Sequence, residues 1–214
     1  AFGIPMRQGL AMEPLAARPT LLALLTGAAL WAGSLGLFEV QYAMWPPPAG
    51  YLEAFQKLHE ALRPAGPLDA VISVATIALM PALCEELLFR GIVLPAFASR
   101  LHAWGAVLLS ALMVGIIHLD VTPDQQVTLY RVPFAAAVGL GLGVLRLRAG
   151  SLMPCILAHA FLNTTTFLLA PLTDDPTGAP EEANLLQGAG LLLAGAAVSA
   201  LLLRRFPTRP PDAA

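Results

Sequence analysis

The chain has 214 residues, of which 57% are hydrophobic and only 12% are charged, and its mean hydropathy is +0.71. An ordinary globular domain is about a quarter charged, so this composition excludes a typical soluble protein and indicates an integral membrane protein. The formal net charge of −2 provides no basic surface for a nucleic acid.

Six segments are apolar over about the 20 residues that a helix needs to cross the hydrocarbon core of a bilayer. In chain order they cover residues 20–44, 68–97, 103–119, 127–147, 151–171 and 185–204. Stretches rich in proline and glycine, such as "WPPPAG" and "DDPTGAP", separate them. The sequence therefore predicts an all-α fold, a polytopic membrane bundle of about six transmembrane helices.

Between the first two spans, the stretch "YLEAFQKLHEAL" is amphipathic but too short and too charged to cross a membrane. It is predicted to be a short interfacial helix. We expect residues 1–19 to be an N-terminal linker, residues 20–206 to form one membrane-embedded domain and residues 207–214 to be a tail. The opening "AFGIPMRQGL" is typical of a linker, which favours a chain cut from a longer protein.

The arginines predict the orientation of the bundle. An even number of spans places both termini on the same side of the membrane, and basic residues are enriched on the cytoplasmic side. We therefore expect both termini to be cytoplasmic. The arginines predicted for that side are Arg7, Arg18, Arg100, Arg146, Arg148, Arg204, Arg205 and Arg209.

Small residues inside the apolar segments are interpreted as packing elements. Cys84 and Cys155 both lie in apolar segments, where a small buried hydrophobic residue is favoured over a disulfide. Gly139, Gly141 and Gly143 resemble a phosphate-binding loop only superficially, because they lie inside a predicted span with no preceding strand. They are predicted to allow close approach between helices.

The segment "LMPALCEELLFRGIV" places three ionisable residues inside the second span. Each costs roughly 2.5–3.5 kcal/mol at the bilayer centre on insertion scales, so such residues are functional candidates by default. Glu86 and Arg90 are four residues apart, so they share a helix face and can pair. Glu85 lies about 100° around the helix and keeps a freer carboxylate, which suits a general base for water. Pro81 is expected to kink the helix one turn earlier.

Two further spans contain matching polar residues. His118 lies near the end of the third span, and His159 and Asn163 share one face of the fifth. In one possible chemistry, Glu85 and His118 activate a water while His159 and Asn163 donate hydrogen bonds to an oxyanion. In another, Glu85, His118 and His159 bind a zinc ion whose water attacks. The sequence lacks the H-E-x-x-H pattern typical of zinc peptidases, which favours the chemistry without metal.

The three motifs resemble those of the CAAX protease and bacteriocin-processing (CPBP or Abi) family of intramembrane proteases. Glu85-Glu86-x-x-x-Arg90 matches its first motif, His118 the histidine of the second, and His159-x-x-x-Asn163 the third. The aromatic position of the second motif is Val114, a departure that concerns packing rather than chemistry. The resemblance covers about residues 68–171.

The resemblance implies an intramembrane endopeptidase in a bacterial inner or plasma membrane, acting on a peptide or membrane-protein substrate. It implies that both glutamates and His118 activate water, that His159 and Asn163 steady the oxyanion, and that an ABC-transporter permease is fused or associated in some relatives. Eukaryotic members of the family trim prenylated C-terminal CAAX tails, whereas many bacterial members have no known substrate. Two alternatives stay open: a binding or immunity protein without catalysis, and a transporter-associated subunit that uses the Glu/His cluster as a proton relay.

Overall fold

The structure is a computed structural model. It describes residues 10–12, 15–48, 51, 53, 57, 60–61, 63–119, 129–169 and 184–206. Its helical elements are α2 (Ala17–Met44), α4 (Pro67–Val74), η1 (Ala75–Leu79), α5 (Met80–Leu88), η2 (Phe89–Val93), α6 (Leu94–Ala98), α7 (Ala103–Ile117), α9 (Val132–Ala149), α10 (Met153–Leu169) and α11 (Leu185–Leu203).

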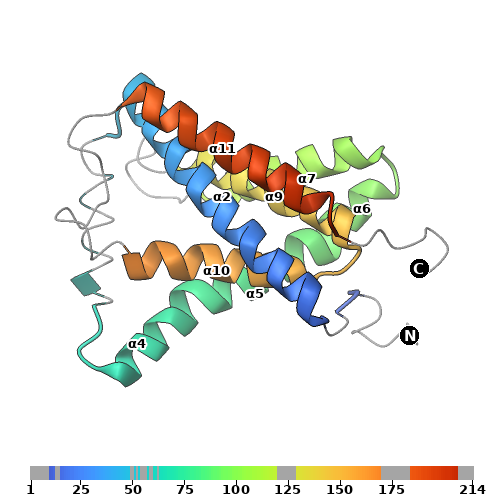
Figure 1. The fold of residues 1–214 in the computed structure, drawn as a ribbon, viewed down its shortest axis with the longest axis horizontal. Helices are drawn as coiled ribbons and strands as arrows, with labels where there is room; N and C mark the ends of the chain where they lie inside the picture. Colours follow the sequence, from blue (N-terminus) through green and yellow to red (C-terminus); the bar gives the residue numbers. More distant parts are fainter. Residues whose placement is uncertain are drawn as a thin grey trace.

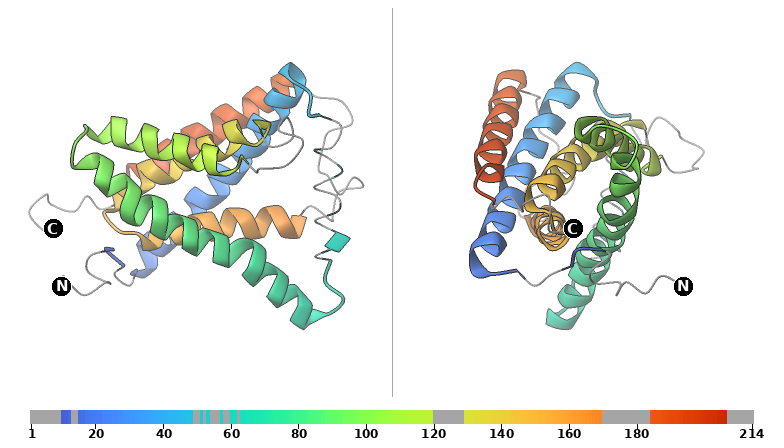
Figure 2. Two further views of the ribbon diagram at one scale, coloured as in Figure 1. Left: turned by 180° about the vertical axis from the view of Figure 1, so that it is seen from behind. Right: turned by 90° about the vertical axis from the view of Figure 1, so that its right-hand side faces the viewer.

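The segments from α4 to α6 follow one another without a break and form one long rod (Figure 2). With this rod counted once, six helical rods are seen among the described residues, and each corresponds to a predicted span. The all-α membrane bundle is thereby confirmed. Of the predicted interfacial helix, only five residues are described; among them Lys57 forms an ion pair of 2.6 Å with Glu53 on the exposed surface.

Four of the rods are long and apolar enough to cross a membrane: α2, the rod at Pro67–Ala98, α9 and α11. The third and fifth predicted spans are shorter helices than expected. The 15 residues of α7 rise about 22 Å, which is less than the roughly 30 Å of the hydrocarbon core. Helix α7 ends where the backbone of His118 leaves the helical conformation, with ψ near 0°.

The long rod contains two widened π turns, each of which ends two residues before a proline. Segment η1 precedes Pro81, and η2 precedes Pro95. A proline has no N–H to donate and its ring collides with the carbonyl four residues earlier, so the preceding turn widens to relieve the collision. Where the sequence predicted a kink at Pro81, the structure thus has a widened turn, and a second widened turn precedes Pro95.

Burial along this rod repeats every four residues. The inward face carries Ala78, Ala82, Glu86, Arg90 and Leu94, all of them at most 2% exposed. In an ideal α-helix, each step of four residues turns about 40° past a full circle. A π turn has more residues per turn than an α-helix, so the widened turns compensate for this extra rotation. Residues four apart therefore keep facing the bundle.

Helices α2 and α11 lie side by side and antiparallel (Figures 1 and 2). Arg18 at the start of α2 donates a hydrogen bond to the carbonyl of Arg205 just after α11, at 3.4 Å. The beginning of the first rod and the end of the last therefore lie at the same end of the bundle, as an even number of spans requires.

The largest apolar core forms where α2, α9 and α10 meet, and it includes Leu22, Leu142, Cys155 and Ala158. Cys155 is buried there as predicted. The prediction that Cys84 is buried is wrong, because Cys84 lies on the outward face of α5. Both cysteines are free thiols.

Glycine permits close approach between helices, as predicted. A Cβ at Gly139 of α9 would lie 3.3 Å from the Cα of Ala111 in α7, and one at Gly143 would lie 3.0 Å from the side chain of Val107. The tightest contact is between α2 and α11, where a Cβ at Gly36 would collide with the backbone nitrogen of Leu192 and would lie 2.6 Å from the carbonyl oxygen of Gly188.

We therefore expect Gly36→Ala to lower the free energy of unfolding by about 1–3 kcal/mol, because backbone atoms cannot move aside as a flexible side chain can. Gly190→Ala is the matched control, since a Cβ at Gly190 of α11 meets nothing within 4 Å. Thermal unfolding of both variants in detergent micelles measures the difference. Equal melting temperatures would show that the two helices separate at little cost.

Candidate active site

A buried ion pair lies at the junction of α5 and η2. Arg90 Nη1 is 2.9 Å from Glu86 Oε1, and the two side chains are 1% and 0% exposed. This pairing confirms the prediction from their spacing. Because a buried ion pair is a poor stabiliser compared with apolar residues, its presence points to a role other than stability.

The same arginine reaches a neighbouring helix. Arg90 Nη2 donates to the carbonyl oxygen of Gly139 in α9, at 2.7 Å. The backbone of α9 is close to α7 at this glycine, where there is no side chain to keep the helices apart. The guanidinium group therefore connects the Glu86 carboxylate to the backbone of a second helix.

His159 of α10 completes the cluster. Its Nδ1 is 2.8 Å from Glu86 Oε1, the oxygen that also accepts from Arg90. An ionised carboxylate can only accept, so Nδ1 bears the hydrogen, and Nε2 is the ring nitrogen left for other partners. Glu86, Arg90 and His159 are called the polar cluster below.

Two atoms of the polar cluster remain without a partner. Within the described part of the chain, neither Glu86 Oε2 nor Arg90 Nε has a hydrogen-bond partner, although both are buried. Buried polar atoms are nearly always paired, so an unpaired carboxylate oxygen in this position is available to a water molecule or a substrate group.

Glu85 and Asn163 lie beside the polar cluster on the same elements. Both are partly buried, and no hydrogen bond joins either side chain to another described residue. Asn163 lies one turn after His159 on the same face of α10. Glu85 precedes Glu86 in α5, so its direction differs by about 100°. Both side chains therefore retain hydrogen-bonding capacity next to a buried charged group.

His118 is held at the C-terminal end of α7. Its Nδ1 lies 2.8 Å from the carbonyl oxygen of Val114, which can only accept, so Nε2 is again the free nitrogen. Val114 is buried against Phe89 and Ala135. The side chain of Phe89 thus fills the space around the position where the second motif usually has its own aromatic residue.

A three-ligand metal site is not assembled among the described residues. No three histidine, cysteine, aspartate or glutamate side chains lie close enough together to bind an ion. Glu86 Oε1 is already occupied by Arg90 and His159. The alternative in which Glu85, His118 and His159 bind a zinc ion therefore receives no support from the geometry of the described residues.

Comparison with known proteins identifies the part of the chain that contains these residues. Residues 67–165 match the family model described as type II CAAX prenyl endopeptidase Rce1-like. Over these residues, slightly less than half of the chain, the sequence is similar to the CAAX prenyl endopeptidase family. The matched region begins with α4 and ends within α10, so it includes the polar cluster together with Glu85, His118 and Asn163. Helices α2 and α11 lie outside it.

An uncharacterized 24.3 kDa protein of Escherichia coli is 33% identical over 100 residues, which are 47% of this chain and 45% of that protein. The chain thus matches less than half of the length of this relative. No solved structure matches the chain. Neither the CAAX prenyl endopeptidase family description nor the name of the relative mentions a transporter permease.

The segment that matches the family model contains two contacts that the sequence did not predict, and the first is the hydrogen bond from Arg90 to the Gly139 carbonyl. Backbone acceptors leave no signal in residue type. The only hint was the glycine itself, which was interpreted correctly as a point of close approach. The bond between His159 and Glu86 was likewise not predicted, because it joins residues 73 positions apart.

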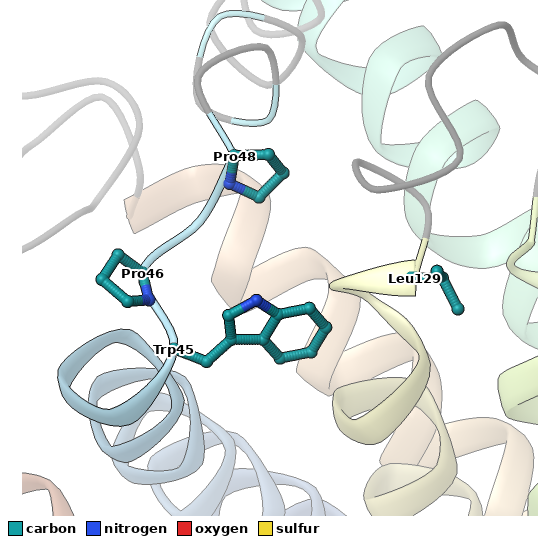
Figure 3. A pocket seen from close by; sticks show the side chains of 4 residues that line it. All are labelled: Trp45, Pro46, Pro48 and Leu129. Carbon is teal, nitrogen blue, oxygen red and sulfur yellow. The ribbon is translucent and has the colours of Figure 1, made fainter.

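A separate cavity of about 280 Å³ lies at the end of α2, lined by Trp45, Pro46, Pro48 and Leu129 (Figure 3). The ring of Tyr130 packs against Trp45 with 5.4 Å between centroids. Of these four lining residues, none is ionisable and only Leu129 lies within residues 67–165, which match the family model. Among the described residues, the lining of this cavity therefore offers no group for acid–base chemistry.

Proposed function

We propose that the protein is an intramembrane endopeptidase that hydrolyses a peptide bond with a glutamate-activated water. The observation that supports this most strongly is the buried polar cluster in the segment that matches a protease family. A charged group buried among apolar helices is costly, and hydrolysis gives a reason for it. The similarity to a protease family indicates which reaction the charged cluster would serve, namely the hydrolysis of a peptide bond.

Glu85 is the general base in this proposal. Glu86 is engaged through Oε1 by both Arg90 and His159, whereas the Glu85 carboxylate has no hydrogen bond to another described residue. Glu85 accepts a proton from water as the water oxygen attacks the peptide carbonyl carbon. His118 assists through Nε2, which the bond from Nδ1 to the Val114 carbonyl leaves free to accept from the same water.

Asn163 and His159 stabilise the oxyanion that forms on the carbonyl oxygen. The amide nitrogen of Asn163 donates in every protonation state of the site. His159 donates through Nε2 only when the ring carries its second proton, because Nδ1 already donates to Glu86. When the tetrahedral intermediate collapses, the C–N bond breaks and the proton held by Glu85 passes to the leaving amine.

Glu86 and Arg90 are positioning residues. The carboxylate fixes the ring orientation of His159, and the guanidinium fixes the carboxylate and attaches it to α9 through the Gly139 carbonyl. Such supporting groups hold reacting groups in a productive geometry.

The substrate, the location and the orientation complete the proposal. A membrane-anchored peptide or membrane protein suits a site among apolar helices, of which four are long enough to cross a bilayer. Prenylated CAAX tails are the first substrates to test, given the family description. The Escherichia coli relative supports a location in a bacterial inner membrane, and the arginine distribution supports an orientation with both termini cytoplasmic.

The test uses purified protein in lipid nanodiscs, a panel of membrane-anchored peptides with and without prenyl groups, and mass spectrometry of the products. Asn163→Ala is expected to lower kcat by about 10²–10³, the usual effect of removing one oxyanion donor, with a small change in KM. Thr164→Ala alters the next residue of α10, about 100° around the helix, and is the matched control. An unchanged kcat in Asn163→Ala would remove Asn163 from the mechanism.

A further inference from the structure

Residues 10–12 contact both the residues just before α10 and the rod that carries Glu86 and Arg90. The carbonyl oxygen of Ala11 accepts two hydrogen bonds, one from the Ser151 hydroxyl at 2.9 Å and one from the backbone N–H of Leu152 at 3.0 Å. Ser151 and Leu152 immediately precede α10, the helix that carries His159. The start of α10 is therefore held by a segment from the other end of the sequence.

The same segment touches the rod that carries Glu86 and Arg90. A Cβ at Gly91 would lie 3.0 Å from Leu10 Cδ2 and 3.7 Å from Leu152 Cδ2, so both leucine side chains lie against Gly91. Gly91 follows Arg90 within η2. A side chain larger than hydrogen at this position would push Leu10 away.

Ala11 adopts a left-handed conformation with φ of 51°, and it is the only non-glycine residue with positive φ among the described residues. Residues with a Cβ rarely adopt this conformation, and it persists only where surrounding contacts enforce it. Here the enforcing contacts are the two hydrogen bonds to the Ala11 carbonyl. The segment is thus held in a specific geometry rather than resting on the surface.

We propose that residues 10–12 form a strap that positions η2 and α10 relative to each other, and so sets the geometry between Arg90, Glu86 and His159. Leu10 and Ala11 are its positioning residues: one contacts the rod at Gly91, the other holds the start of α10. The catalytic consequence rests on the proposed function, whereas the positioning itself does not. Movement of the N-terminal segment then changes the site without any contact with substrate.

The test compares Ala11→Pro with Ala11→Gly in the full chain. Proline cannot adopt a φ of 51°, so it detaches the strap, whereas glycine adopts this φ readily and retains the carbonyl. Ser151→Ala, which removes one of the two donors, is an intermediate case and remains available if Ala11→Pro does not fold. Hydrogen exchange by mass spectrometry follows the amides of η2 and of the first turns of α10.

We expect Ala11→Pro to speed exchange in both segments by about tenfold, with α11 unchanged and Ala11→Gly like the wild type. Wherever cleavage is measurable, Ala11→Pro is expected to lower kcat about tenfold with little change in KM, because misplaced catalytic groups slow chemistry more than binding.

If η2 and the first turns of α10 exchange in Ala11→Pro at the wild-type rate, the proposal of a strap is overturned. Faster exchange with an unchanged kcat would overturn its positioning role, and equal effects of proline and glycine would show that the left-handed conformation is irrelevant. If the wild-type protein cleaves nothing, the proposed function fails while the exchange comparison still decides whether the strap exists.

Discussion

Glu85→Ala is expected to lower the cleavage rate by a factor of about 10²–10⁴, the usual contribution of a general base, while the protein still folds. The Glu85 side chain has no hydrogen bond to another described residue, so its removal leaves no buried partner unpaired. The rate is measured on the nanodisc panel, and the melting temperature in detergent reports the fold.

Glu85→Gln provides the sharper comparison, because it keeps the shape of the side chain and removes the base. It should be as inactive as Glu85→Ala. Cys84→Ala is the control from the neighbouring outward-facing position of α5 and should retain full activity. Full activity in purified Glu85→Gln would contradict the assignment and favour a binding protein that needs only the shape of the site.

Arg90→Met is expected to lower the free energy of unfolding by about 3–5 kcal/mol, because it leaves the Glu86 carboxylate buried without its cation. Both side chains are almost completely buried, so solvent screening reduces this effect very little. The substitution also removes the donor to the Gly139 carbonyl. Chemical unfolding in mixed micelles measures the loss.

The double variant Glu86→Gln with Arg90→Met distinguishes two causes of the lost stability: a buried carboxylate left without its cation, and the packing lost with the arginine side chain. Without a carboxylate there is no unpaired charge to bury, so the double variant should be more stable than Arg90→Met alone. It should nevertheless be a poor enzyme, because His159 loses the ionised acceptor that orients its ring. If Arg90→Met unfolds like the wild type, the ion pair is not buried as described.

Sequence alone predicted the features that depend on local spacing. The lengths of the apolar segments predicted the six rods, and the spacing of four residues predicted the Glu86–Arg90 ion pair. The small residues of the fourth span predicted the close contact between helices at Gly139. Each of these depends only on the geometry of one helix or on the volume of one side chain. Such rules hold whatever the rest of the fold does.

The remaining features depend on which helices become neighbours. The bond between His159 and Glu86 requires α10 to lie against α5, and no spacing along the chain encodes that. The exposure of Cys84 depends on which side of α5 faces outward. The hydrogen bonds to the Ala11 carbonyl connect backbone atoms, which have no signature in residue type.

The two prolines of the long rod have a consequence for the site, although neither belongs to the polar cluster. If the rod wound as a uniform α-helix, Ala78 and Leu94 would diverge by about 160° around its axis, and Glu86 and Arg90 would rotate toward lipid with them. The widened turns before Pro81 and Pro95 prevent this rotation. The direction in which Glu86 and Arg90 point from the helix axis thus depends on two uncharged prolines that lie more than one helical turn away.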